Sequence, residues 1–176
     1  MTNDSTTVNL YILCGLPFSG KTVFSNALCR IKGWVRVDLD DIKFNLFGNQ
    51  VKDSDLVQKD WDLVYQRMYK EIQDQLSRGV TVVHDTGNFT KHERSSVRDI
   101  AKRLGLRSMT IWVNTPESVV RARLLANRQS GERFDVSDED FASTVTELEP
   151  PDSSEDFLTY DTTTTPEVWI ARNLYQ

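Results

Sequence analysis

The residues from Gly15 to Thr22, which read GLPFSGKT, have the spacing of a loop that binds phosphate groups. They match the pattern GxxxxGK followed by Ser or Thr, and they stand between an apolar run and a segment with helical periodicity. Glycines let the backbone aim its N–H groups inward, and a helix that begins there adds partial positive charge. The lysine would reach the β and γ phosphates, and the threonine hydroxyl would bind Mg²⁺. The pattern therefore predicts binding of ATP and Mg²⁺ by Gly15, Pro17, Ser19, Gly20, Lys21 and Thr22.

Aspartates follow two predicted strands at places where they could serve phosphoryl transfer. That reaction needs a carboxylate to take the proton of the accepting hydroxyl, a metal ion beside the phosphates and cations around the transferred group. Asp40 and Asp41 follow the second strand, so we expect one of them to be a general base, with Asp38 a weaker candidate. Either could instead only cap the helical turn that begins at Ile42. Asp85 ends the third strand and is predicted to bind Mg²⁺ directly or through water.

Three arginines lie in a helical segment that Pro116 opens. A lid that closes over ATP would use one or two of them to neutralise the charge that develops during transfer. We predict this lid over residues 116–136, with Arg121 at the nucleotide and with Arg123 and Arg128 as catalytic groups. The alternative is a solvated helix face on which arginines pair with nearby glutamates.

Strands and helices alternate along the chain that must position these groups. Short apolar runs bounded by turn residues predict strands, and longer periodic segments predict helices. The predicted strands are 8–14, 34–37, 80–83, 107–113 and 157–160. The predicted helices are 21–31, 53–77, 91–104, one that follows a Thr115 cap, one that Ser137 starts, and 166–174. The pattern predicts an α/β protein with a three-layer P-loop NTPase fold, whose five-stranded parallel sheet is covered by helices on both faces.

The composition limits the classes of protein to which the chain can belong. Its 176 residues predict a single domain, 1–176, and a net charge of −5 argues against a protein that coats nucleic acid. No apolar run approaches a membrane span, and the polar start at Met1 to Thr7 lacks the features of a signal peptide, so we expect a cytoplasmic protein. Cys14 and Cys29 are interpreted as reduced packing residues.

Taken together, these residues resemble the P-loop kinases related to polynucleotide 5′-hydroxyl kinase, zeta toxin and chloramphenicol phosphotransferase, a group often called AAA-type predicted kinases. The resemblance rests on the phosphate loop, on DDIK at 40–43 with LFG at 46–48, on DTGNFT at 85–90, on the arginines after Pro116, and on EPP at 149–151. It implies that Asp40 is the general base and that Asp41, Lys43, Asn88 and Thr90 lie on the acceptor side.

The sequence departs from that group in two places. Such kinases usually carry arginine three residues after the catalytic aspartate, where this chain has Lys43, which cannot make a planar bidentate contact to phosphate. Their paired lid arginines are normally four residues apart, whereas Arg123 and Arg128 are five apart.

The sequence thus predicts an ATP-dependent kinase that phosphorylates a hydroxyl, but it leaves the acceptor open. A small metabolite is slightly favoured over a nucleic-acid 5′ end. A groove for one or two terminal nucleotides needs only a few cations, which Lys32, Lys43, Lys91 and Arg94 could supply if they converge near Asp40. A protein of another class, an ATP-binding switch or interaction module with little phosphotransfer, is the alternative.

Overall fold

A computed structural model describes residues 7–131 and 135–174 of the chain. Its centre is a five-stranded sheet in which every pair of neighbouring strands is parallel. The spatial order is β2 (Val35–Asp38), β3 (Val82–Asp85), β1 (Val8–Cys14), β4 (Arg107–Val113) and β5 (Phe157–Tyr160). The carboxyl ends of β2, β3 and β1 are therefore adjacent, and the segments that leave them share one edge of the sheet.

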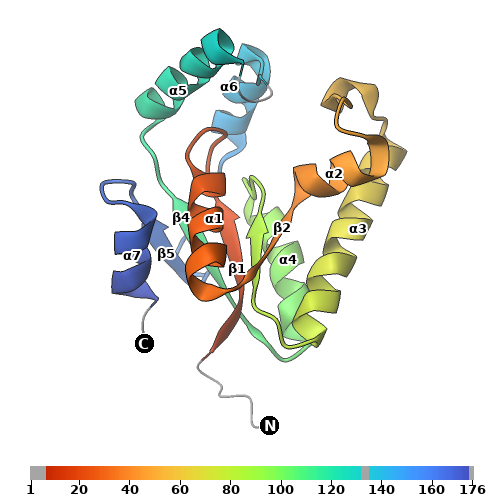
Figure 1. Ribbon diagram of the computed structural model, residues 1–176, viewed down its shortest axis with the longest axis vertical. Helices are drawn as coiled ribbons and strands as arrows, with labels where there is room; N and C mark the ends of the chain where they lie inside the picture. The colour runs from red at the N-terminus through yellow and green to blue at the C-terminus, as the bar shows by residue number, and fades with distance from the viewer. Residues whose placement is uncertain (1–6, 132–134, 175–176) are drawn as a thin grey trace.

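Helices cover both faces of this sheet, as Figure 1 shows. Side chains of β1 alternate between the faces: Tyr11 and Leu13 pack against α1 (Lys21–Lys32) and α7 (Pro166–Asn173). Leu10 and Ile12 pack against α3 (Gln58–Ser77) and α4 (Lys91–Arg103) on the other side. The predicted three-layer α/β fold is confirmed.

The remaining helices lie around the edge where the strands end. α5 (Glu117–Ser130) and α6 (Asp138–Glu147) pack on the phosphate loop through a small apolar cluster of Leu16, Val120, Leu124 and Phe141. On the far side of the edge, α2 (Leu39–Phe47) leads through a 3₁₀ turn (Asp53–Asp55) into α3. In Figure 1 the α5–α6 pair and α2 stand on opposite sides above the sheet. Of the helices in the described part of the chain, none has the length and apolar character that crossing a bilayer requires.

The structure corrects several expected boundaries. The helix expected over 53–77 begins only at Gln58, because Leu56 and Val57 are extended and Asp60 accepts a hydrogen bond from the Val57 N–H. Residues 39–47 form a helix where only a turn was expected. The third strand occupies 82–85 rather than 80–83. Thr115 does not cap α5: Pro116 is the N-cap residue, and the Thr115 hydroxyl donates to Ser19 O at 2.7 Å.

Candidate active site

The phosphate loop connects β1 to α1 in a backbone conformation that needs glycine at two positions. A Cβ on Gly15 would lie 2.7 Å from Val113 O, and Gly20 has a φ of 106°. Gly20 is the N-cap of α1; no side chain caps this helix, and its first turn holds no acidic residue. Ser19 Oγ is buried without a hydrogen-bond partner among the described residues. An open helix N-terminus next to an unsatisfied hydroxyl fits the binding of phosphate.

Lys21 and Thr22 lie at the start of α1, as the motif requires. The Lys21 ammonium folds back on the loop and donates to Gly15 O and Leu16 O, both at 2.8 Å. Ser25, one turn after Thr22 along α1, donates to Asp85 Oδ2 at 2.6 Å and has its hydroxyl 3.1 Å from Thr22 O. Ser25 thus contacts the backbone carbonyl of Thr22 and the carboxylate of Asp85, the two residues predicted to bind Mg²⁺.

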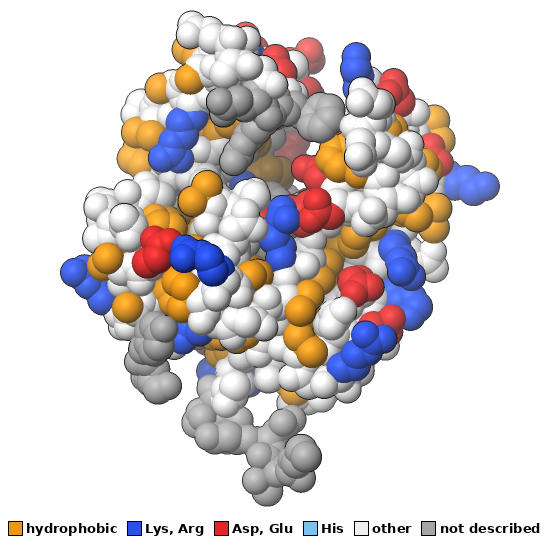
Figure 2. Space-filling model, in the orientation of Figure 1, with side chains coloured by type: hydrophobic (Ala, Val, Ile, Leu, Met, Phe, Trp, Pro, Cys, Tyr) orange, Lys and Arg blue, Asp and Glu red, His pale blue; other side chains and the backbone are white. Residues whose placement is uncertain are grey.

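Arg36 links three carboxylates at the edge of the sheet. Its Nε donates to Asp85 Oδ2 at 2.8 Å, its Nη1 to Asp41 Oδ2 at 3.0 Å, and its Nη2 to Asp38 Oδ2. Asp38 and Asp85 are register partners at the ends of β2 and β3. Figure 2 shows acidic and basic side chains meeting at the centre of this face, below the hollow that separates the α2 region from the α5–α6 region.

The N-cap of α2 is Asp38, whose side chain accepts from the Asp41 N–H at 3.0 Å. Capping by Asp40 or Asp41, the alternative to base catalysis, is therefore wrong: both lie within the first turn of the helix. Burial raises the pKa of Asp38 to about 6, although the Asp41 N–H and the Arg36 guanidinium oppose this rise. Asp38 is buried, whereas the Asp40 side chain is 66% exposed and can meet a ligand.

Lys43 is a buried cation with partners inside the protein. Its ammonium is 2.8 Å from Asp40 Oδ1 and 2.7 Å from Asp53 Oδ1, and it lies over the rings of Phe44 and Trp61. Burial lowers the pKa of Lys43, but the two carboxylates outweigh it and leave the pKa above the usual value. The ammonium therefore stays charged and fixes one oxygen of Asp40.

Two further residues expected on the acceptor side, Asn88 and Thr90, lie in the connection between β3 and α4. Thr90 caps α4 and forms a capping box with Glu93. Asn88 is buried, with Nδ2 donating to Leu13 O at 2.7 Å and lying 3.2 Å from His84 Nδ1. Both side chains hold the shape of this connection.

Of the three candidate lid arginines, only Arg123 contacts the phosphate loop. Its Nη1 donates to Phe18 O and Ser19 O, both at 3.0 Å. Arg121 pairs with Glu117 at 2.7 Å and lies over the Phe141 ring. Arg128 pairs with Asp135 and Asp138 and donates to Val136 O. Part of the predicted lid, 132–134, lies outside the described residues.

A cavity of about 540 Å³ opens beside the phosphate loop. Residues of that loop, of α5 and of the segment after β5 line it, including Arg123, Tyr160 and Thr162. Within the described ranges, 7–131 and 135–174, no group of three or more His, Cys, Asp or Glu side chains forms a metal site. Mg²⁺ that enters with a nucleotide needs only one or two carboxylates because the phosphates supply the other ligands.

Sequence reasoning did not single out Arg36. Arg36 lies on a four-residue strand between Val35 and Val37, and this lone charge in a short apolar run was the only local indication of a role in the site. Nor did it foresee that Arg94 would be buried against Glu155.

Comparison with known proteins agrees with this architecture. Similar solved structures include a sugar kinase from Janibacter (15% identity, TM-score 0.67, covering 96% of this chain and 93% of that one). Others are APS kinase from Mycobacterium tuberculosis, solved with AMPPNP and APS (15% identity, TM-score 0.63, 95% of both chains), and the Pnkp1/Rnl/Hen1 RNA repair complex (19% identity, TM-score 0.69, 84% of this chain and 47% of that one). Comparison with curated protein sequences gave no match.

These likenesses show a shared P-loop fold, as the sequence resemblance implied. The sequence model of the AAA domain family matches residues 10–151, which is more than half of the chain. The protein belongs to the AAA domain family.

Proposed function

We propose that the protein is an ATP-dependent kinase that transfers the γ-phosphoryl group to a hydroxyl of a small molecule. One observation carries this proposal: the strand order β2-β3-β1 makes three strand ends neighbours, with Asp40 in the first turn of the helix after β2, Asp85 at the end of β3 and the phosphate loop after β1. A base, a metal-side carboxylate and a phosphate cradle are the parts that phosphoryl transfer to a hydroxyl requires.

Each group has a defined role in this proposal. Backbone N–H groups at the start of α1, from Gly20 to Thr22, and the Lys21 ammonium bind the phosphates, after Lys21 releases Gly15 O and Leu16 O. The 540 Å³ cavity receives the nucleoside. Thr22 and Asp85 would hold Mg²⁺, which neutralises phosphate charge when it is bound.

Asp40 faces the acceptor in the proposed reaction. The acceptor oxygen bonds to the γ phosphorus while the bond from that phosphorus to the β,γ-bridging oxygen of ATP breaks, and Asp40 takes the hydroxyl proton. Because Lys43 holds Oδ1, the other oxygen of Asp40 is left to accept that proton. Arg123, which already lies over the phosphate loop, stabilises the charge on the transferred group. That Arg121 and Arg128 act as lid residues remains a prediction.

The internal contacts of the basic residues favour a small molecule over a nucleic-acid end. The four cations that the sequence offered for a nucleotide groove do not converge near Asp40. Lys32 donates to Leu174 O, Lys91 pairs with Asp152, and Arg94 is fully buried. Only Lys43 is beside Asp40, and two carboxylates already neutralise it. Among the described residues, these four therefore do not form a cationic track for a chain of phosphates, and this favours a small acceptor.

The test offers radiolabelled ATP with Mg²⁺ to two sets of acceptors: hydroxyl-bearing metabolites and a 5′-hydroxyl oligonucleotide over a range of salt. We expect a labelled small-molecule product. Transfer to the oligonucleotide that weakens steeply with salt would instead establish a nucleic-acid acceptor. Slow ATP hydrolysis without any labelled product would favour the ATP-binding switch.

The cytoplasmic location that the sequence predicts remains a prediction.

A further inference from the structure

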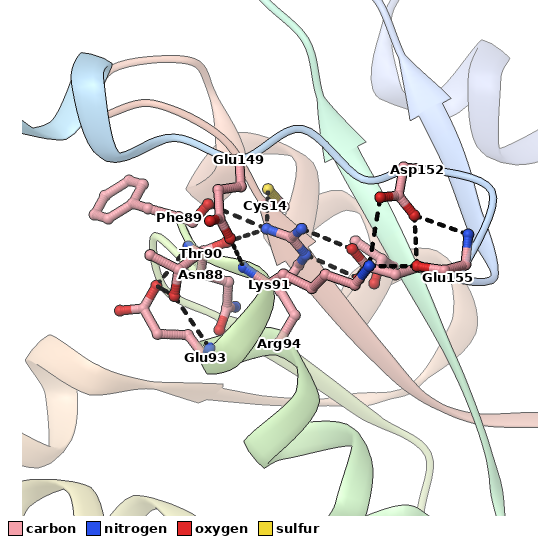
Figure 3. A network of polar contacts seen from close by, with 12 residues as sticks. Cys14, Asn88, Phe89, Thr90, Lys91, Glu93, Arg94, Glu149, Asp152 and Glu155 are labelled. Atoms are coloured by element: carbon pink, nitrogen blue, oxygen red, sulfur yellow. Dashed lines mark hydrogen bonds and ion pairs between the residues drawn. The ribbon is translucent and has the colours of Figure 1, made fainter.

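A buried ion pair lies behind the proposed site, at the connection between β3 and α4. Arg94 on α4 has no exposed surface, and its guanidinium binds the Glu155 carboxylate at two points, 2.9 Å from Nε to Oε2 and 2.7 Å from Nη2 to Oε1. Figure 3 shows Arg94 at the centre of this network. Burial raises the pKa of Glu155, but hydrogen bonds from Arg94 and Arg98 outweigh this and hold the pKa below its usual range. Glu155 therefore stays ionised.

The remaining amino group of Arg94 reaches two other segments. Nη1 donates to Asn88 O at 3.0 Å and to Phe89 O at 3.1 Å, and it lies 3.6 Å from Cys14 Sγ at the end of β1. One guanidinium thus joins the residue before the phosphate loop, the β3–α4 connection and the segment that precedes β5.

The β3–α4 connection needs such support because of its conformation. Asn88 has a φ of 46°, in the left-handed region that costs energy for a residue with a Cβ. The neighbouring carbonyl, Phe89 O, accepts from Glu149 N at 2.9 Å as well as from Arg94. Gly15 N donates to Gly87 O at 3.2 Å, so the connection also adjoins the phosphate loop. Because β3 lies between β1 and β2, this connection separates the phosphate loop from Asp40.

Stability alone does not account for the ion pair. Well-packed apolar residues of similar volume often replace a buried ion pair with no loss of stability, or with a gain, because charges lose so much hydration on burial. Apolar side chains cannot donate to the carbonyls of Asn88 and Phe89. Beyond packing, the arginine therefore fixes the backbone of Asn88 and Phe89 next to the proposed site.

The geometry points to Arg94 as a positioning residue that, through Glu155, fixes residues 86–90 between the phosphate loop and the acceptor. This inference rests on the proposed function. A misplacement of about 1 Å can cost on the order of 10²-fold in rate, so Arg94 affects turnover rather than ATP affinity.

The experiment compares four full-length variants with the wild type: Arg94→Met, Arg94→Lys, the double variant Arg94→Met/Glu155→Leu, and Arg98→Gln. Arg98 is the matched control because it also pairs with Glu155, at 2.6 Å, but has no contact with Asn88 or Phe89. The readouts are urea unfolding, AMPPNP–Mg²⁺ affinity by calorimetry, phosphate release from ATP–Mg²⁺, and amide hydrogen exchange of the peptides that cover 86–91.

We expect the double variant to be at least as stable as Arg94→Met and to bind AMPPNP–Mg²⁺ within about 3-fold of wild type. Its phosphate release should nevertheless fall by on the order of 10-fold or more, and exchange at 86–91 should speed up. Arg94→Lys should keep the charge without restoring turnover, since one ammonium cannot reach all four partners. Arg98→Gln should behave like wild type.

Wild-type turnover and protection in the double variant would overturn the inference. So would an equal loss in Arg98→Gln, because charge rather than placement would then matter, or a parallel loss of nucleotide affinity, which would assign Arg94 to the phosphate loop. If the wild type gave no labelled product with any acceptor in the screen, the proposed function would fail separately, and hydrogen exchange at 86–91 would still decide the role of Arg94.

Discussion

Replacing Asp40 by asparagine removes the proposed base while changing little else in the fold. The side chain is 66% exposed and has one ion-pair partner, Lys43, which keeps Asp53 after the substitution. Asp40 is the exposed member of this pair, and the buried Lys43 keeps a charged partner, so we expect the free energy of unfolding to fall by only about 1 kcal/mol. Loss of general base catalysis should lower kcat by on the order of 10²-fold or more, which corresponds to about 3 kcal/mol of transition-state stabilisation.

The assay measures kcat and KM for ATP with an acceptor found by the screen, and urea unfolding of the same samples. Asp41→Asn is the matched control, since Asp41 is adjacent and similarly exposed but pairs with Arg36. It should keep kcat within about 3-fold of wild type, because Asp40 takes the proton; a contact between Asp41 and the acceptor would change the KM for the acceptor instead. The reasoning is refuted if Asp40→Asn keeps full kcat, or if it loses ATP affinity as much as it loses kcat.

Three further variants test other parts of the site. Asp85→Asn should raise the Mg²⁺ concentration for half-maximal activity by roughly 10-fold, and an unchanged requirement would remove Asp85 from the metal site. Arg123→Ala should lower kcat by on the order of 10²-fold. Arg121→Ala serves as the control because it loses contacts with Glu117 and the Phe141 ring but none with the phosphate loop; equal losses in the two variants would contradict the assignment. Burial lowers the pKa of His84 from 6.5 to about 4, so between these pH values the unfolded chain binds a proton that the folded protein excludes. The free energy of unfolding should therefore decrease as the pH falls from 6.5 towards 4, by at most about 3 kcal/mol. Asp38, whose pKa is raised to about 6, opposes this trend, so unfolding of wild type and His84→Asn should be compared across that range; identical pH profiles would show that His84 does not contribute.

The sequence predicted those parts of the site that are contiguous in the chain. The phosphate loop is one run of residues between a strand and a helix, so its pattern alone indicated both its shape and its chemistry. The five strands were predicted with shifts of up to two residues, because apolar runs and turn residues mark them directly.

Contacts between distant segments left no comparable signal. Arg36 meets Asp85 across 49 residues and Arg94 meets Glu155 across 61, and nothing in the local pattern distinguishes such arginines from solvated ones. Thr115 looked like a helix cap because of its type and place, but its hydroxyl instead reaches Ser19 O in the phosphate loop. Tertiary contacts of this kind override local preference.

The central claim is that the phosphate loop binds ATP for transfer to a hydroxyl. The most direct measurement follows the γ phosphate of labelled ATP in the presence of Mg²⁺ and the acceptor panel, with wild type and Lys21→Ala in parallel. The account predicts a labelled acceptor with the wild type, formed faster than free phosphate, and no product with Lys21→Ala. Labelled product at the wild-type rate from Lys21→Ala, or free phosphate alone from the wild type, would contradict it.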